Sequence, residues 1–234
     1  MSTINICQNI NSIKERIATA CLKAGRNPAD VQLIAVSKTK PNSAILEALK
    51  CGQLAFGENR MQELGEKMSA IDDDSISWHM IGTLQSNKIR FIAERVDWIH
   101  SVGKTSHFKE IEKRAKNANR TINTLIQVNI SGESQKDGCE PEEISKILDY
   151  TKNLSHVKVR GLMGMATFAD DAELVRPEFQ LLSKLLQEHQ HYNGGNIQLD
   201  QLSMGMSADM EVAIEEGATM VRVGSDIFGS RNYP

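Results

Sequence analysis

The sequence lacks paired cysteine motifs and lacks any apolar stretch long enough to span a bilayer. Its four cysteines, Cys7, Cys21, Cys51 and Cys139, are widely scattered and form no CxxC pair. This pattern argues against both a zinc site and a disulfide framework. The reduced environment of the cytoplasm suits such a chain.

The chain also lacks an excess of charge of either sign, because its formal net charge is only -3. A nearly balanced chain has no general field that attracts nucleic acid or acidic lipids, so we expect neither as a partner. Low-complexity stretches and long linkers are absent as well. With 234 residues, of which 40% are hydrophobic, we expect one domain over 1–234 that binds a small molecule as a monomer.

The N-terminal segment predicts an amphipathic helix. Apolar residues recur there at helical spacing from Ile6 to Ala20. Charged residues at 14–16 interrupt the pattern, unlike the core of a signal peptide or a membrane span.

Short apolar runs alternate with helical patterns along the rest of the chain, which indicates parallel βαβ units. The eight predicted strands are Leu33–Ser37, Leu54–Gly57, Trp78–Gly82, Trp98–Val102, Thr124–Ile130, Val159–Ala166, Gln201–Gly205 and Met220–Gly224. Helices are predicted near 42–51, 60–70, 85–95, 104–119, 141–153, 171–190 and 207–217, the last with Ser207 as its N-cap. Eight units without a long linker favour an α/β fold, a (β/α)8 TIM barrel with an extra N-terminal helix, over an open sheet.

Several polar residues fall where predicted strands end, and βα loops at such ends form the active sites of these barrels. They are Lys38, Asn59, Ser203 and Arg222, with Gly224 and Ser225 following. Phosphate often binds after the seventh and eighth strands. An amine, a fixed cation and phosphate-binding groups at one mouth predict a cofactor site.

Alternation along the strands sorts side chains between the helices and the barrel axis. Val221 and Val223 suit the layer beneath the helices, which turns Arg222 toward the axis. The same rule places Gln127 and Asn129 inside the barrel. The interior is therefore predicted to be partly polar.

Each of these residues also has a plainer interpretation. Lys38 fits an ordinary lysine that reaches solvent at a strand end. A buried arginine needs partners, so Arg222 fits a structural ion pair with Glu58. His79 has no second histidine or carboxylate at convincing ligand spacing, which favours a stacking or core role over metal binding.

Five segments spanning most of the chain resemble one protein family. They are AVSKTKP (35–41), FGENRMQE (56–63), WHMIGTLQSNK (78–88), GLMGM (161–165) and LSMGMSADMEVAIEEGATMVRVGSDIFGSR (202–231). On these motifs the sequence resembles the pyridoxal phosphate homeostasis protein family, which is similar in fold to the N-terminal barrel of bacterial alanine racemase. One departure is Ala166-Thr167-Phe168, where relatives often carry a proline.

The resemblance implies that Lys38 holds pyridoxal 5′-phosphate (PLP) as a Schiff base. It further implies that Ser203, Gly224 and Ser225 contact the phosphate, that Arg222 faces the pyridine nitrogen, and that Asn59, His79 and Met204 line the pocket. The implied function is intracellular PLP homeostasis without catalytic turnover, as a carrier or buffer whose recipients are apo-forms of PLP enzymes.

Elementary chemistry agrees with these roles. A nearby cation and desolvation favour the neutral amine of Lys38, and only a neutral amine adds to an aldehyde. Backbone N–H groups at Gly224 and Ser225 suit a phosphate. An arginine opposite the pyridine nitrogen hardly gives up a proton, so the ring stays neutral and is a poor electron sink. Carbanion chemistry is thereby discouraged.

Two other functions use similar parts. A PLP-dependent amino-acid racemase normally needs a base on each face of its substrate and continues into a second domain. Tyr150 and Tyr192 fall at helix ends on the opposite face of the barrel, which leaves Tyr233 in the tail as the sole tyrosine able to reach the site. A sugar-phosphate aldolase has a Schiff-base lysine but no need of Arg222. The carrier is therefore preferred.

Overall fold

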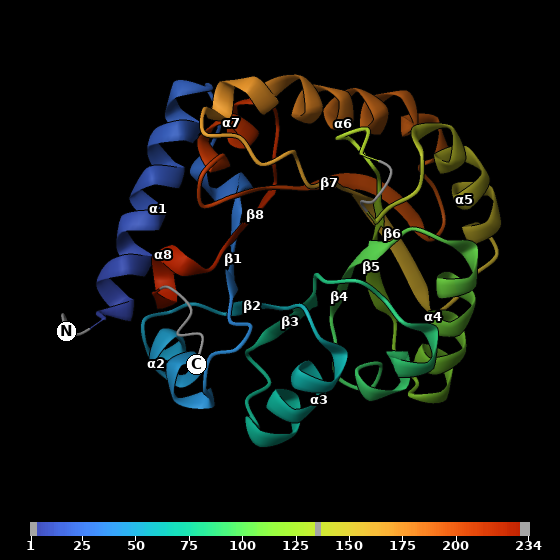
Figure 1. The fold of residues 1–234 in the computed structure, drawn as a ribbon. Helices are drawn as coiled ribbons and strands as arrows, with labels where there is room; N and C mark the ends of the chain where they lie inside the picture. The colour runs from blue at the N-terminus through green and yellow to red at the C-terminus, as the bar shows by residue number, and fades with distance from the viewer. Residues whose placement is uncertain (1–3, 134–136, 230–234) are drawn as a thin grey trace.

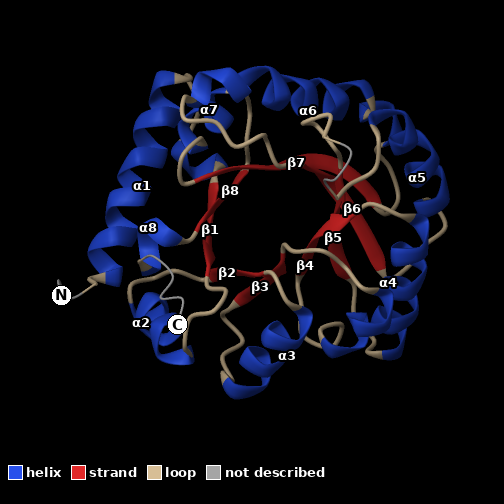
Figure 2. Ribbon diagram, viewed as in Figure 1, coloured by secondary structure: helices blue, strands red, loops and turns tan. Residues whose placement is uncertain are grey.

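Eight parallel strands follow one another around a closed barrel in a computed structural model that describes residues 4–133 and 137–229 (Figures 1 and 2). Helices surround the strands on the outside. The last strand pairs with the first, with Arg222 opposite Ile34, so the barrel closes. The predicted (β/α)8 TIM barrel is confirmed.

The strands are β1 (Gln32–Val36), β2 (Ala55–Glu58), β3 (Ser77–Met80), β4 (Trp98–Val102), β5 (Ile122–Gln127), β6 (Val157–Met163), β7 (Ile197–Met206) and β8 (Met220–Val223). The helices are α1 (Ile6–Lys23), α2 (Asn42–Lys50), α3 (Met61–Ala70), α4 (Thr105–Asn117), α5 (Ile144–Thr151), α6 (Arg176–Glu188), α7 (Met210–Glu215) and α8 (Ser225–Phe228). Short 3-10 turns are η1 (Pro28–Asp30), η2 (Ser86–Phe91), η3 (Pro141–Glu143), η4 (Ala172–Val175) and η5 (Gln190–Tyr192).

Two helix predictions are wrong in detail. The segment predicted as a helix over 85–95 forms η2, in which bonds such as Ile92 N–H to Ile89 O span three residues. Its buried isoleucines at that spacing suit a three-residue turn better than an α-helix. Ser207 does not cap α7, because the helix begins later, after Asp209, whose Oδ1 accepts from the Met206 N–H at 2.6 Å.

The N-terminal helix α1 buries its predicted apolar face, from Ile6 to Ala20. It packs against α7, α8 and α2 on one side of the barrel (Figure 1). Among the described residues, no helix has both the length and the apolar character needed to cross a membrane.

The buried apolar residues form two clusters. The larger one joins the outer faces of the strands to the helices and contains Val221 and Val223. The smaller one lies within the barrel and contains Ile34, Leu125 and Met220. Arg222 therefore lies on the inner face of the barrel, as predicted. The barrel interior also contains the buried polar residues Ser203, His79 and His100.

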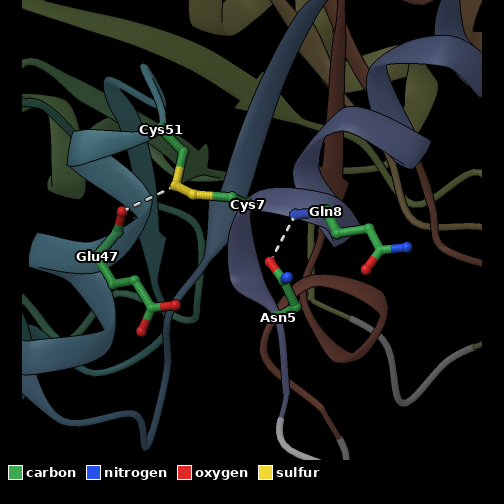
Figure 3. The surroundings of a disulfide bond; sticks show 5 residues. All are labelled: Asn5, Cys7, Gln8, Glu47 and Cys51. Atoms are coloured by element: carbon green, nitrogen blue, oxygen red, sulfur yellow. Dashed lines mark hydrogen bonds between the residues drawn. A yellow bond between two sulfur atoms is a disulfide. The ribbon is translucent and has the colours of Figure 1, made fainter.

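A disulfide joins Cys7 of α1 to Cys51, which follows α2, with a Cα–Cα distance of 5.4 Å (Figure 3). The prediction that no disulfide forms is wrong. The two cysteines are 44 residues apart, and only the packing of α1 against α2 brings them together. Cysteine spacing therefore gives no support for a reducing compartment. Cys21 and Cys139 are free and buried.

Candidate cofactor site

Lys38 is half-buried in a tight turn that follows β1 at the mouth of the barrel. The Lys40 N–H donates to Ser37 O at 3.0 Å and closes this turn, and Thr39 adopts a left-handed φ of 64°. Glu63 accepts from the Thr39 N–H at 2.6 Å. The backbone on both sides of Lys38 is thus held in place.

A buried charged cluster supports the turn from the helix side. Lys67 of α3 donates to Ser37 O at 2.8 Å and to Glu58 Oε1 at 2.8 Å, and it also pairs with Glu63 at 2.7 Å. Burial raises the pKa of Glu58, although Lys67 opposes this shift. Glu58 therefore pairs with Lys67, and the structural alternative of a Glu58–Arg222 pair is wrong.

Arg222 lies inside the barrel and is only 5% exposed. Its NH1 donates to Ser203 Oγ at 2.5 Å and its NH2 donates to Gly164 O at 3.0 Å. Both partners are neutral, and within the described residues no ion pair involves Arg222. Burial lowers the pKa of Arg222 to about 10, although the more distant charge of Asp209 opposes this shift.

A chain of hydrogen bonds continues from Ser203 across the barrel interior. Ser203 Oγ lies 2.9 Å from His100 Nδ1, and His100 Nε2 lies 2.9 Å from His79 Nδ1. His79 Nε2 then lies 3.1 Å from Ser77 Oγ. Burial lowers the pKa of His79 to about 3, while burial and the neighbouring His79 and Arg222 lower the pKa of His100 well below 6.5. Both imidazoles are neutral at physiological pH.

His79 has the stacking and core role that its sequence context favoured. Its ring stacks on Trp98 with centroids 5.8 Å apart, and it is fully buried. It therefore lies beneath the mouth and supports the interior hydrogen-bond chain.

A cleft of about 460 Å³ opens among the loops that follow the strands. Asn59 lines it, as do the inward residues Gln127 and Met165. Asn129, also predicted to face inward, instead binds the loop after β5 through Glu133 O at 3.2 Å. The cleft lies at the end of the barrel where Asn59 was expected to act. Of the predicted cofactor residues, all of which the structure describes, only Asn59 lines it, and neither Lys38 nor Arg222 does.

The loops after β7 and β8 meet the mouth beside Arg222. We call residues 207–209 and 224–226 the cradle loops, although the second range includes the first two residues of α8. Gly224 is half-buried and Ser225 is exposed, and α8 begins at Ser225 as a single turn. A side chain at Gly224 would approach Val36 O of β1 at 3.2 Å, so the absence of one allows the two strand ends to lie close.

Two predicted residues lie deeper than the mouth. Ser203 is fully buried, with its hydroxyl bound to Arg222 and His100. Met204 is also fully buried and belongs to the cluster between strands and helices. The register between β7 and β8 shifts between Ser203 and Met206, so β7 continues beyond Ser203 before it reaches the rim. The hydroxyl that follows the end of β7 belongs to half-buried Ser207.

Sequence reasoning missed His100 and the position of Ser207. His100 follows Trp98 by two residues in β4, and alternation places both on the inner face. Strand alternation alone therefore predicts that His100 faces the barrel interior. Tyr150 and Tyr192 lie in α5 and η5, in segments that lead back to the amino ends of strands. Tyr233 lies outside the described residues.

The fold and the site define a class of barrel protein. The sequence matches the family "Alanine racemase, N-terminal domain" over residues 8–232. Alanine racemase from Corynebacterium glutamicum is 15% identical with a TM-score of 0.72, over 98% of this chain and 63% of that one, which shows a shared fold.

Within that class the chain has nearer relatives. It is 44% identical to the pyridoxal phosphate homeostasis protein of Aquifex aeolicus, over 98% of this chain and 100% of that protein, and 38% identical to the Escherichia coli K12 protein of that name, over 98% of both. PipY of Synechococcus elongatus, solved with PLP bound, is 37% identical over 93% of this chain and 100% of PipY, with a TM-score of 0.79. The chain belongs to the pyridoxal phosphate homeostasis protein family.

Proposed function

We propose that residues 1–234 act as one PLP-binding domain in PLP homeostasis, as a carrier or buffer without turnover of its own. Lys38 holds the cofactor as a Schiff base. The observation that carries this proposal is the pairing of β1 with β8, which puts Lys38 and buried Arg222 at the ends of adjacent strands.

The residues present suit this cofactor. A guanidinium has five N–H donors, and the described bonds of Arg222 involve only its NH1 and NH2 groups. The remaining donors and the uncompensated positive charge fit an acceptor such as a ring nitrogen. When bound, PLP supplies a reactive aldehyde and an electron-accepting ring. Arg222 donates to that ring without protonating it, because an arginine hardly releases its proton.

The depth of each residue in the barrel indicates which part of the cofactor, or which neighbouring residue, it contacts. Gly224, Ser225 and Ser207 are the groups that we propose for the phosphate, since they lie at the rim. Ser203 acts behind Arg222 and holds it in position, and His79 supports Ser203 through His100. Buried Met204 contributes its main chain only. Asn59 contacts the ring edge from the cleft.

The same residues argue against racemisation. A racemase needs a second base opposite the lysine. Tyr150 and Tyr192 belong to segments at the opposite end of the barrel, and Arg222 keeps the ring a weak electron sink. We therefore propose a protein that binds and releases PLP.

Transfer of the cofactor tests the function directly. PLP-loaded protein is incubated with apo-forms of several PLP enzymes, and recovery of their activity is followed against an equal concentration of free PLP. A panel of amino acids is tested for turnover in parallel. Transfer without turnover is expected, whereas turnover of any amino acid would favour an enzyme.

The partners that we propose are PLP and apo-enzymes that receive it, with the carrier acting as a monomer in the cytoplasm. Size-exclusion chromatography with light scattering checks the monomer. Cell fractionation checks the location, which the cysteine pattern no longer supports.

A further inference from the structure

Arg16 of α1 reaches both cradle loops. Its NH2 donates to Ser207 O at 2.9 Å, in the loop after β7. Its NH1 donates to Asp226 Oδ2 at 3.1 Å, in the single turn of α8 that follows β8. One guanidinium on the added N-terminal helix therefore joins the segment after β7 to the segment after β8. Figure 1 shows α1 beside α7 and α8, the two helices that follow these segments.

Arg16 is held firmly in this position. Its Nε donates to Glu211 Oε1 at 2.7 Å and its NH2 to Glu211 Oε2 at 3.2 Å, so the pair is bidentate. These carboxylates raise the pKa of Arg16, with the Glu211 hydrogen bond first among the causes. Asn9 adds a bond from the same helix to Ile227 O at 2.9 Å.

The charges at this position matter as much as the geometry. Asp226 follows Ser225 directly, and Glu211 lies in the first turn of α7. Two carboxylates beside a phosphate site repel a dianion, since like charges disfavour one another's charged forms. Arg16 neutralises part of this charge while it fixes the loops. Its single side chain thus acts on phosphate affinity in two ways.

We propose that Arg16 is a positioning residue for the phosphate of the cofactor, an inference that rests on the proposed function. It holds the backbone of Ser207 beside the side chain of Asp226 at the start of α8, and it offsets the negative charge of Asp226. Binding of the phosphate therefore depends on α1, a helix outside the eight βα units.

The chain offers a matched control. Lys23 lies on the same helix and pairs with Glu215 of α7 at 2.6 Å. This ion pair also joins α1 to α7. However, Glu215 is the last residue of α7, whereas the cradle loop 207–209 precedes the first residue of that helix. Lys23→Gln therefore weakens the same helix contact without touching those loops.

The experiment compares PLP with pyridoxal, which lacks the phosphate. Dissociation constants for both ligands are measured by absorbance for wild type, Arg16→Gln, Arg16→Lys and Lys23→Gln, with melting temperatures recorded alongside. Arg16→Gln should weaken PLP binding by about three- to tenfold, the effect of losing a partly exposed charged network, and change pyridoxal binding less than about twofold. Arg16→Lys should fall between, and Lys23→Gln should match wild type.

A double variant tests whether Arg16 acts by offsetting the charge of Asp226. Asp226→Asn removes the repulsion that Arg16 offsets, so Arg16→Gln with Asp226→Asn should regain part of the lost PLP affinity. Equal losses for PLP and pyridoxal in Arg16→Gln, or no loss, would overturn the inference while leaving the proposed function intact. Equal wild-type affinities for the two ligands would remove the proposed phosphate site and overturn this inference. Failure of the wild type to bind PLP would instead overturn the proposed function and this inference with it.

Discussion

The guanidinium of Arg222 donates to the hydroxyl of Ser203 at 2.5 Å, and this bond limits what Ser203 can do. Arginine has no acceptor, so Ser203 Oγ must accept. Among the described residues, the remaining partner of that hydroxyl is His100 Nδ1. Ser203 therefore donates its own proton to His100, and the next two bonds acquire a fixed direction, from His100 to His79 and from His79 to Ser77.

This direction predicts the tautomers of two buried histidines. His100 and His79 should both carry their proton on Nε2, since each Nδ1 accepts. Long-range ¹H–¹⁵N NMR correlations of ¹⁵N-histidine-labelled protein distinguish the two tautomers. The variant Ser203→Ala removes the donor to His100 and should release this preference. Protonation on Nδ1 of both rings in the wild type would show that the chain runs the other way.

The same histidines should make stability depend on pH. Burial depresses the pKa of His79 to about 3, so the folded state stays neutral where the unfolded state, with a pKa near 6.5, gains a proton. The unfolded state binds more protons below pH 6.5, so stability falls as the pH drops from 6.5 toward 3, by up to about 1.4 kcal/mol per pH unit for His79. Urea unfolding between pH 7.5 and 5 should give a shallower slope for His79→Gln. Identical slopes for the two proteins would contradict this account.

The parts of the site that depend on strand alternation could be predicted from the sequence. Arg222 was placed inside the barrel because Val221 and Val223 require the helix layer. The depth of Ser203 could not be predicted, because it depends on a register shift between β7 and β8 that no local pattern encodes. The disulfide between Cys7 and Cys51 likewise depends on how two distant helices pack.

The proposed phosphate contacts give a prediction that separates residues at the rim of the barrel from residues in its interior. Replacing Ser207 or Ser225 by Ala should weaken PLP binding by about 1–3 kcal/mol and leave pyridoxal binding nearly unchanged, because a charge-assisted hydrogen bond is lost. Ser203→Ala should weaken both ligands, because it disturbs Arg222. Fluorescence titration with each ligand measures this. A phosphate-specific loss in Ser203→Ala alone would show that Ser203 contacts the phosphate, as the family resemblance implies.

The disulfide predicts a measurable contribution to stability. Cys7→Ser opens a loop with a sequence separation of 44, so the free energy of unfolding should fall by about 2–4 kcal/mol under oxidising conditions. Burial raises the pKa of Cys139 to about 12 and also raises that of Cys21, so neither thiol should react in the folded state. Thiol titration in denaturant should find two thiols without reductant and four with it. Equal stability of Cys7→Ser and wild type would contradict a structural role for the bond.

Attachment should occur at Lys38 and nowhere else. Lys40 is the nearest competitor, but its Nζ already donates to Phe228 O at 2.9 Å and to Gly229 O at 3.0 Å. Purified protein with PLP should show a visible absorbance band that borohydride removes, and peptide mapping should then find the pyridoxyl group on Lys38. Lys38→Ala should lose the label, and Lys40→Ala should keep it. Labelling of Lys40 in the wild type would show that the turn after β1 has been misassigned.

The proposed absence of turnover rests on Arg222 together with the lack of a second base near the site, because Arg222 alone does not separate a carrier from a racemase. The described bonds of Arg222 go to neutral groups. If its guanidinium faces the ring nitrogen as proposed, that nitrogen stays unprotonated, and a proton on the α-carbon of a bound amino acid gains little acidity. Mixed with L- or D-alanine in deuterium oxide, the wild type should show no racemisation and negligible exchange at the α-carbon. Arg222→Glu should let the ring hold a proton, so slow exchange should appear while PLP affinity falls, and Arg222→Lys serves as the control that keeps the charge. Proton NMR and chiral chromatography follow both reactions. Racemisation by the wild type at about 1–1000 per second, the ordinary range for enzymes, would replace the carrier with a racemase and require a second base near the site.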